Sequence, residues 1–375
     1  MVVNTFGWEN IIGNNLNFTE VKKMKKIALL YGGKSAEHEV SLSTARAVVG
    51  ALNFNQYEVY PVYITLDGEW LTGSQLTSPV NTIEELQFAA SNRPNNISQF
   101  IEAHEKLQFD VVFPLLHGTN GEDGTVQGLL EVLNIPYVGN GVLASSAGMD
   151  KVVMKQLFEV EGLNQTPYVY FIRKDWEQDA KSVLDACEKL NYPLFIKPAN
   201  LGSSVGINRA TNRDELSEAI EIALRYDRKI IVEQGVVGRE IEMAVLGNDQ
   251  PKTSVVGEIK PLTEFYDYDS KYKDNTTQLI IPAHVTDEVL EKMKETAIRA
   301  FKILDLSGLV RADFFVTQEN DVIINEVNTM PGFTPVSMYP MLWQKSGLSY
   351  PELIDKLIDL ALERFNEKQK LQYNK

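Results

Sequence analysis

Hydrophobic and polar residues alternate along two short segments in the last third of the chain. Residues 311–316 and 323–327 are rich in Val, Ile and Phe, which favour β-strands. The polar residues 317–321 between them are typical of a turn. The pattern therefore predicts a β-hairpin, in which side chains alternate between the two faces of each strand.

The predicted hairpin has polar side chains within apolar strands. On the first strand, one face is expected to hold Arg311, Asp313 and Phe315. On the second strand, one face is expected to hold Ile324, Glu326 and Asn328. If the polar positions converge, two carboxylates and an amide oxygen form an all-oxygen ligand set that suits Mg²⁺ better than Zn²⁺. The alternative is an amphipathic hairpin with a solvated face, which we disfavour because carboxylates within apolar strands need a partner.

The first third of the chain combines short apolar runs with helical periodicity. Strands are predicted at 27–31, 58–64 and 110–116. The first strand is followed by a glycine-containing loop at 32–41 and a helix at 43–52. This order is typical of an open α/β sheet that binds a phosphate or carboxylate at the carboxyl ends of its strands.

The glycine loop matches neither common nucleotide motif. Gly33-Lys34-Ser35 is similar to the end of a P-loop, but Ala28 stands where that motif needs glycine, and the Rossmann glycine pattern is absent. His117 lies in a second glycine-rich loop, directly after the strand predicted at 110–116. We interpret His117 as a binding-site residue rather than a structural histidine, because ligands bind at the ends of such strands.

The middle of the chain contains a nucleotide signal. Lys197 lies inside a strand predicted at 192–198, and a lysine in an apolar strand needs an anionic partner. The loop 200–206 is rich in Gly and Ser, whose backbone N–H groups and hydroxyls can surround a polyphosphate. Either feature is weak alone, but together they indicate a nucleotide site. Around them, strands are predicted at 168–172 and 229–234, and helices at 150–160, 176–190 and 214–226.

A long segment without periodicity, 261–282, follows strands predicted at 240–246 and 255–260. Its polar and aromatic composition predicts an ordered lid rather than a disordered loop, and we expect it to become more protected when ligands bind. Helices are predicted at 287–304 and 351–366, on either side of the hairpin.

The composition is that of a folded chain with more than one domain. The chain has 375 residues, 44% hydrophobic and 23% charged, so two or three domains are expected. Its net charge of −15 disfavours non-specific nucleic-acid binding. Cys187 is the single cysteine, which excludes an internal disulfide and is typical of a reducing cytosol. No apolar run has transmembrane length, and no signal-peptide pattern is present.

The first residues differ in character from the rest. Residues 1–23 are polar and rich in Asn, and Met24 directly precedes the first predicted strand. We therefore expect Met24 to be the natural start and residues 1–23 to be a disordered leader that can be removed without loss of activity. A short ordered N-terminal arm is the alternative.

Four motifs, in this order, resemble those of the D-alanine–D-alanine ligase family of the ATP-grasp superfamily. They are Gly32-Gly33-Lys34-Ser35-Ala36-Glu37-His38-Glu39-Val40-Ser41, His117-Gly118 with 121–124, Lys197-Pro198 with 202–206, and Asn325-Glu326-Val327-Asn328-Thr329 with 331–334. The resemblance runs from Met24 to the last helix and leaves out the leader. It implies an α/β (α+β) fold with three-domain ATP-grasp architecture. The implied parts are an N-terminal open α/β sheet domain (24–140), a central ATP-grasp subdomain (141–236) and a C-terminal catalytic ATP-grasp domain (237–375).

The resemblance also implies roles for individual residues. The ATP phosphates and adenosine would be held by Lys151, Lys197, Gly202, Ser204, Val205, Glu233 and Glu240. Two Mg²⁺ or Mn²⁺ ions would be bound by Asp313, Glu326 and Asn328. The first D-alanine would contact Glu37 and His117, and the second Ser337 and Met338. An oxyanion site would comprise Arg311 and the Gly332 backbone. Glu37 would be linked to the lid, which contains Lys271, by Ser203 and Tyr272.

The implied reaction is the ATP-dependent joining of two D-alanines through a D-alanyl phosphate, with release of ADP and phosphate, for peptidoglycan precursor synthesis. The resemblance further implies a homodimer and activation by K⁺. The charge, the single cysteine and the lack of a long apolar run predict a cytoplasmic protein without a nucleic-acid or membrane partner. On this reading, Tyr272→Phe should lower dipeptide synthesis modestly and raise the relative use of D-lactate.

Three alternatives stay open on sequence alone. The first is a sister ligase that makes D-alanyl-D-lactate or D-alanyl-D-serine, although the segment 265–272 matches the dipeptide-forming members. The second is another ATP-grasp enzyme such as a carboxylase subunit, which the motif at 32–37 disfavours. The third is an ATP-binding regulator without catalysis, which the intact polar set of the hairpin disfavours.

Overall fold

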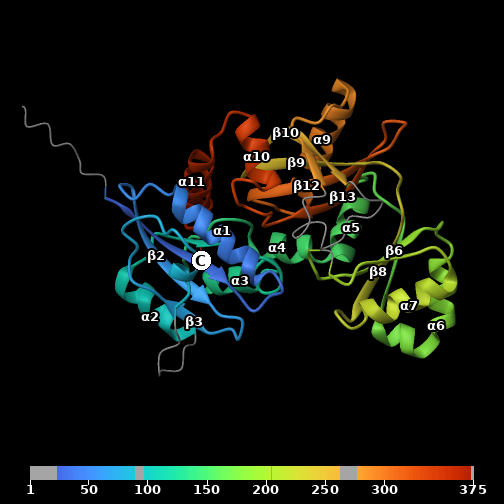
Figure 1. Ribbon diagram of the computed structural model, residues 1–375, viewed down its shortest axis with the longest axis horizontal. Helices are drawn as coiled ribbons and strands as arrows, with labels where there is room; N and C mark the ends of the chain where they lie inside the picture. Colours follow the sequence, from blue (N-terminus) through green and yellow to red (C-terminus); the bar gives the residue numbers. More distant parts are fainter. Residues whose placement is uncertain (1–22, 89–96, 204, 262–276, 373–375) are drawn as a thin grey trace, which may run out of the picture.

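The computed structural model describes residues 23–88, 97–203, 205–261 and 277–372. Its strands form three sheets. In Figure 1 the first sheet lies at the left, the third at the upper centre and the second at the right. The mixed α/β architecture predicted from the sequence is therefore present.

The first sheet has the strand order β3-β2-β1-β4. Its strands are β1 (Lys25–Gly32), β2 (Tyr57–Ile64), β3 (Trp70–Thr72) and β4 (Val111–Pro114). Because β1 is parallel to both β2 and β4, the loops that follow these strands leave from one edge. Those loops contain Glu37 and His117. The accompanying helices are α1 (His38–Ala51), α2 (Ile97–Leu107) and α3 (Thr125–Val132).

The second sheet is antiparallel, in the order β5-β8-β6-β7. Its strands are β5 (Tyr168–Ile172), β6 (Leu194–Pro198), β7 (Asn208–Ala210) and β8 (Lys229–Gln234). Its helices are α6 (Arg173–Cys187) and α7 (Arg213–Ala223), and Cys187, the last residue of α6, is fully buried in the core that they share with the sheet. Two helices, α4 (Val142–Met149) and α5 (Lys151–Val160), connect the first sheet to the second.

The third sheet has the order β11-β10-β9-β12-β13. Its strands are β9 (Arg239–Gly247), β10 (Lys252–Pro261), β11 (Thr277–Ile280), β12 (Gly308–Val316) and β13 (Val322–Asn328). The helices of this part are α9 (Asp287–Ile303), α10 (Met338–Lys345) and α11 (Tyr350–Lys368).

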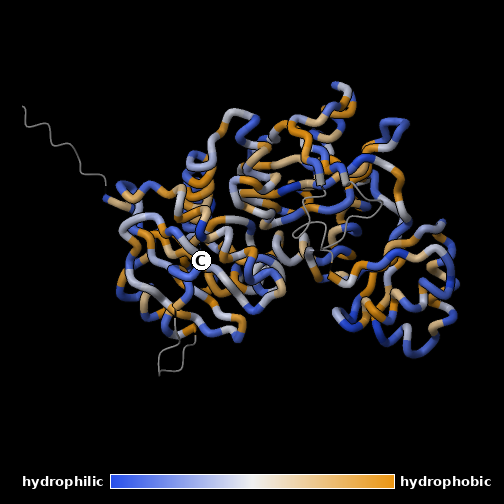
Figure 2. The backbone as a smooth tube through the Cα atoms, in the orientation of Figure 1, coloured by the Kyte–Doolittle hydropathy of each residue, from blue (hydrophilic) through white to orange (hydrophobic). Residues whose placement is uncertain are grey.

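The C-terminal helices share a hydrophobic core with the first sheet. This core includes Leu29 of β1, Leu42 of α1 and Leu357 of α11, all fully buried. The ring centroids of Phe113 and Phe333 lie 6.1 Å apart across it. Figure 2 shows hydrophobic backbone segments in the interior of each part and hydrophilic ones toward the outside. The packing brings the segment 329–338 next to the loops of the first sheet.

The predicted hairpin is confirmed, with one correction. β12 and β13 pair antiparallel, with Asp313 opposite Glu326 and Phe314 opposite Ile324. A β-bulge therefore adds Asn325 to β13, and Ile324 turns into the core that contains Phe314. The prediction that Ile324 shares a face with Glu326 was wrong, because strict alternation does not continue across a bulge.

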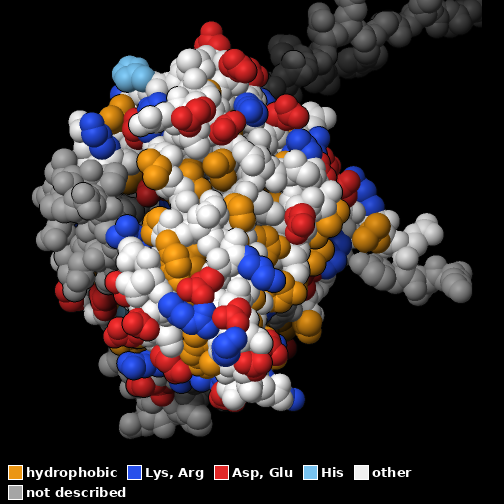
Figure 3. Space-filling view, turned by 90° about the vertical axis from the view of Figure 1, so that its right-hand side faces the viewer, with side chains coloured by type: hydrophobic (Ala, Val, Ile, Leu, Met, Phe, Trp, Pro, Cys, Tyr) orange, Lys and Arg blue, Asp and Glu red, His pale blue; other side chains and the backbone are white. Residues whose placement is uncertain are grey.

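Several expectations fall outside the described residues. The leader, most of the predicted lid at 261–282, and the residues Ser204, Lys271 and Tyr272 belong to this group. Among the helices that are described, none is long and apolar enough to cross a membrane. On the face seen in Figure 3, Lys and Arg side chains are interspersed with Asp and Glu.

Candidate active site

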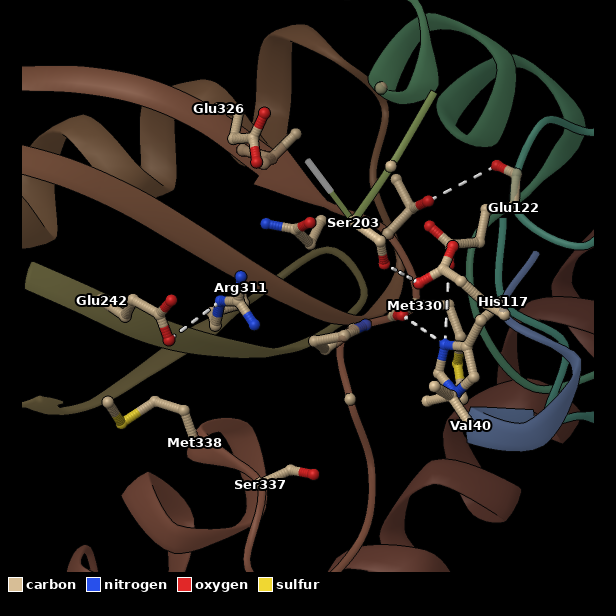
Figure 4. A pocket seen from close by; sticks show the side chains of 18 of the residues that line it. Val40, His117, Glu122, Ser203, Glu242, Arg311, Glu326, Met330, Ser337 and Met338 are labelled. Carbon is tan, nitrogen blue, oxygen red and sulfur yellow. Dashed lines mark hydrogen bonds and ion pairs between the residues drawn. The ribbon is translucent and has the colours of Figure 1, made fainter. Parts of the chain in front are cut away.

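A cavity of about 260 Å³ lies where the three sheets meet, and Figure 4 shows part of its lining. Its walls come from α1, the loop after β4, the start of α5, the loop between β6 and β7, the third sheet and the segment 329–338. The lining includes these predicted site residues: Glu37, His117, Lys151, Gly202, Ser203, Arg311, Glu326, Asn328, Gly332, Ser337 and Met338. Residues from all parts of the chain thus converge on one space.

Glu37 joins the first sheet to the second at the cavity wall. The hydroxyl of Ser203, in the loop between β6 and β7, donates a hydrogen bond to its carboxylate. The backbone of Gly118 also approaches Glu37 closely. Gly118 has a φ of +74°, and a Cβ there would lie 2.7 Å from the Glu37 Oε2 atom. Only glycine therefore permits this approach of the loop after β4.

His117 is a buried histidine at the same wall. Its Nδ1 atom lies 3.2 Å from the Met330 carbonyl oxygen and 3.5 Å from a Glu122 carboxylate oxygen, and its Nε2 atom lies 3.2 Å from the Thr44 hydroxyl (Figure 4). Burial disfavours the charged form, but Glu122 and then Glu37 outweigh it, so the pKa of His117 is raised. Protonated, it would favour an anionic group in the cavity.

Arg311 is held by carboxylates on two neighbouring strands. Its Nε and Nη2 atoms donate to Asp313 at 2.7 and 2.8 Å, and Nε also lies 3.0 Å from Glu242 of β9. Burial opposes its charge, but Asp313 and then Glu242 outweigh that effect and raise the pKa of Arg311 well above its ordinary value. The Asn328 amide donates to the same Asp313 carboxylate at 2.8 Å. The cavity wall therefore carries a fixed, charged guanidinium that can stabilise a developing negative charge.

Glu326 and Lys151 face each other across the cavity wall. The Lys151 Nζ atom lies 3.6 Å from Glu326 and donates to the Leu201 carbonyl at 2.8 Å. Lys151 starts α5, whose first N–H groups are capped by the Asp150 carboxylate. The side chain of Glu326 is 27% exposed, so its carboxylate is accessible to a ligand.

A cluster of three charged side chains, Glu233, Lys197 and Lys155, lies beside the cavity, between β6, β8 and α5. The Glu233 carboxylate lies 2.6 Å from the Lys197 Nζ atom and 3.3 Å from the Lys155 Nζ atom. Burial raises the pKa of Glu233, but Lys155 and Lys197 together lower it to about 2. Burial also opposes the charge on Lys197, but Glu233, followed by Glu326 and Glu240, raises its pKa. Burial dominates at Lys155 and lowers its pKa.

The segment before α10 forms the remaining wall. The Ser337 hydroxyl lies 2.8 Å from the Thr334 hydroxyl, and Met338 follows as the first residue of the helix. A Cβ on Gly332 would lie 3.2 Å from the Ser337 Oγ atom, so this backbone passes close to the hydroxyl. Polar and apolar groups thus adjoin at this end of the cavity.

Some predicted site residues do not line the cavity. Lys197, Val205, Glu233, Glu240 and Asp313 lie outside its lining. Of these, Asp313 is directly behind Arg311, and Lys197 and Glu233 bind each other. Among the described residues, no three His, Cys, Asp or Glu side chains form a metal-binding group, and the predicted set contains only two carboxylates.

Three partners were missed by the sequence analysis, namely Glu122, Glu242 and Lys155. Glu122 lies in the glycine-rich motif at 121–124, to which the sequence analysis assigned no role. Glu242 interrupts the apolar strand β9, which is the kind of signal that drew attention to Lys197. Lys155 follows Lys151 by one helical turn, and that spacing places the two lysines on one face of α5.

Comparisons with known proteins find similarity to D-alanine–D-alanine ligases along almost the whole chain. Family models described as D-ala D-ala ligase N-terminus and D-ala D-ala ligase C-terminus match residues 26–140 and 157–359. A D-alanine–D-alanine ligase of Bacillus velezensis is 58% identical over 352 residues, which cover 92% of this chain and 99% of that protein. One of Listeria innocua is 56% identical over 363 residues, covering 93% and 98%.

The chain is also similar to solved structures of such ligases. The D-alanine–D-alanine ligase from Coxiella burnetii has a TM-score of 0.75 and 34% identity, covering 92% of this chain and 96% of that one. The VanG D-Ala:D-Ser ligase from Enterococcus faecalis has a TM-score of 0.76 and 36% identity, covering 90% and 100%. The D-alanine–D-alanine ligase from Bacillus anthracis, complexed with ATP, has a TM-score of 0.74 and 28% identity, covering 92% and 99%. The chain therefore belongs to the D-alanine–D-alanine ligase family.

Proposed function

We propose that this protein uses ATP to join two D-alanines into D-alanyl-D-alanine, releasing ADP and phosphate, for peptidoglycan precursor synthesis. One observation supports this most strongly. A single cavity is lined by Glu37 with Ser203, by His117 and by Arg311, which come from three different sheets or their loops. Such a site offers separate groups for an ammonium, a carboxylate and a developing oxyanion.

The roles at the amino-acid end follow from charge. Glu37 and His117 bind the first D-alanine, because a carboxylate attracts its ammonium and a protonated imidazole attracts its carboxylate. Ser337 and Met338 receive the second D-alanine at the other end of the cavity. Arg311 and the Gly332 N–H stabilise the tetrahedral oxyanion. Ser203 fixes Glu37, and Tyr272 and Lys271 are proposed to approach from the segment 261–282.

The nucleotide is proposed to lie between the second and third sheets. Lys151 and Lys197 bind its phosphates, and Gly202, Ser204 and Val205 supply the loop around them. Glu233 and Glu240 contact the adenosine. The contacts of Lys151 with the Leu201 carbonyl and with Glu326 support this placement, because they join the loop between β6 and β7 to β13 of the third sheet.

Divalent cations are proposed at Asp313, Glu326 and Asn328. The donor set consists of hard oxygens, which fits Mg²⁺ or Mn²⁺. In the structure Asp313 accepts from Arg311 and Asn328, and Glu326 lies near Lys151, so a cation would share these carboxylates with existing partners. When bound, the ions would neutralise negative charge on the phosphates.

The chemistry proceeds in two transfers. A carboxylate oxygen of the first D-alanine attacks the γ-phosphorus, and the bond from phosphorus to the ADP oxygen breaks. Lys151 and Lys197 offset the repulsion between the two anions. The deprotonated amine of the second D-alanine then attacks the acyl carbon beside Arg311. Phosphate leaves with the oxygen that made the first attack.

An isotope experiment tests this sequence of steps. D-Alanine labelled with ¹⁸O in both carboxylate oxygens is incubated with the protein, ATP and Mg²⁺, and the released phosphate is analysed by mass spectrometry. We expect one ¹⁸O atom in each phosphate. Unlabelled phosphate, with dipeptide still formed, would reject the acyl phosphate while leaving the overall activity intact.

D-Serine is a second candidate for the acceptor. The similarity to the D-Ala:D-Ser ligase favours this alternative over D-lactate. It would change the group received near Ser337 and Met338 but not the activation of the first D-alanine. A competition between acceptors therefore separates the two functions.

The remaining proposals concern the whole protein. We propose a cytoplasmic homodimer activated by K⁺, without nucleic-acid or membrane partners, and domains at 24–140, 141–236 and 237–375. The three separate sheets support the division into domains. Sedimentation analysis tests the homodimer. Activity measured with K⁺ replaced by Na⁺ tests the activation by K⁺.

A further inference from the structure

Lys155 is a buried lysine for which the proposed reaction has no use. Its side chain is 1% exposed, and it does not line the cavity described above. Its Nζ atom donates to the Thr166 hydroxyl at 3.0 Å and lies 5.7 Å from the centre of the Tyr168 ring. Removing a lysine from water is unfavourable unless a counter-charge compensates for it. Its counter-charge is Glu233, at 3.3 Å.

Glu233 has one lysine on each of its two carboxylate oxygens. Lys197 binds Oε2 at 2.6 Å, and Lys155 binds Oε1. The residue is only 4% exposed, so two positive charges surround one buried negative charge. One lysine alone would neutralise the carboxylate. The side chain of Lys197 is 12% exposed and that of Lys155 is 1% exposed, so Lys197 is the one closer to solvent.

We infer that Lys155 is a positioning residue that keeps Glu233 neutralised while Lys197 binds the ATP phosphates. This inference rests on the proposed function, in which Lys197 is a phosphate ligand. The phosphates compete with Glu233 for the Lys197 ammonium. Without Lys155, a move of Lys197 toward ATP would leave a buried carboxylate without a counter-charge, which is strongly unfavourable. Thr166 and Tyr168 hold Lys155 in place, so it stays with Glu233.

A purely structural ion pair makes a different prediction. If Lys155 only stabilises the fold, its removal lowers the melting temperature but leaves the affinity for ATP unchanged. If it frees Lys197, its removal weakens ATP binding even where the protein is folded. The dissociation constant for a non-hydrolysable ATP analogue, measured by calorimetry on the full chain, separates the two.

The test compares Lys155→Met and Lys155→Gln, which remove the charge at similar length, with the wild type. Both variants should bind the analogue at least about tenfold more weakly, because Lys197 stays with Glu233. The KM for D-alanine should stay within about twofold, since the amino-acid groups are untouched. The control is Lys181→Met, which removes a lysine paired with Asp185 on α6, and its ATP affinity should stay within about twofold.

A double-mutant cycle adds the decisive comparison. In a Glu233→Gln background no carboxylate needs a counter-charge, so adding Lys155→Met should change the ATP affinity by less than about threefold. An equal loss in both backgrounds, or an unchanged affinity in Lys155→Met and Lys155→Gln, would overturn the inference. The proposed function fails separately, if the wild type forms no D-alanyl-D-alanine from ATP and D-alanine.

Discussion

Glu326 is the carboxylate of the hairpin that is accessible from the cavity, and its charge is needed where phosphates bind. Glu326→Gln should reduce kcat at least about 100-fold, because it removes a negative charge that divalent cations require. The melting temperature should change little, since the amide is isosteric with the carboxylate. The control is Glu319→Gln, in the exposed turn of the same hairpin, which should leave kcat unaltered. Near-normal turnover by a folded Glu326→Gln protein would contradict the metal assignment.

Glu233 makes stability depend on pH. Its pKa is depressed from the ordinary 4.5 to about 2. The unfolded chain therefore binds more protons between these values, so the contribution of Glu233 is complete above pH 4.5 and is lost as the pH falls toward about 2. The difference in unfolding free energy between wild type and Glu233→Gln should shrink over this range in urea titrations. A difference that stays constant over this range would show that the carboxylate is not held ionised by its lysines.

Individual site residues were predictable where a polar group interrupts an apolar pattern, as at Lys197 and Asp313. Their partners were not. Glu242 meets Arg311 because β9 pairs with β12, which places Glu242 opposite Asp313 from 71 positions away along the chain. Local periodicity contains no information on which distant strand is the neighbour. Lys155 could not be predicted for the same reason, because its partner Glu233 lies on β8, which is distant along the chain.

The bulge in β13 allows one strand to serve both the core and the site. Asn325 is the extra residue, and it lets Ile324 face the core while Glu326 faces the cavity. Deleting Asn325 should turn Val322 and Ile324 out of the core, or Glu326 out of the cavity, because a one-residue shift reverses the faces. We expect destabilisation of about 2–5 kcal/mol, as for the loss of buried aliphatic side chains, and loss of activity.

The control for this deletion is Asn325→Ala, which keeps the chain length and the bulge. It should retain most of the stability and activity. Chemical denaturation and dipeptide formation measure both properties. A deletion variant as stable and active as Asn325→Ala would show that the bulge has no such role.

Helices and strands with strong periodicity were predictable almost to the residue, as β5 and β8 show. Predictions failed at short or irregular elements. α1 begins at His38, earlier than the predicted 43, because the polar residues His38 and Ser41 lie on its buried face. β3 has three residues and was not predicted, since its formation depends on pairing with β2 rather than on its own sequence.

At the scale of the molecule, one hydrophobic core joins the proposed N-terminal and C-terminal domains. The core around β1 and α1 continues into α10 and α11, so the first and last elements that the structure describes pack together. This packing sets Met330 against His117 and holds the segment 329–338 at the cavity. The order of motifs along the chain predicted the family, but the shared core appears only once the elements are placed in space.

The proposed activity is tested by giving the wild-type chain ATP, Mg²⁺ and D-alanine, with D-serine and D-lactate present as competing acceptors. ADP formation is followed and the products are identified by mass spectrometry. We predict ADP formation that requires D-alanine, with D-alanyl-D-alanine as the main product and almost no D-alanyl-D-lactate. ADP formation that is independent of D-alanine, or a predominance of D-alanyl-D-serine or D-alanyl-D-lactate, would contradict the proposal.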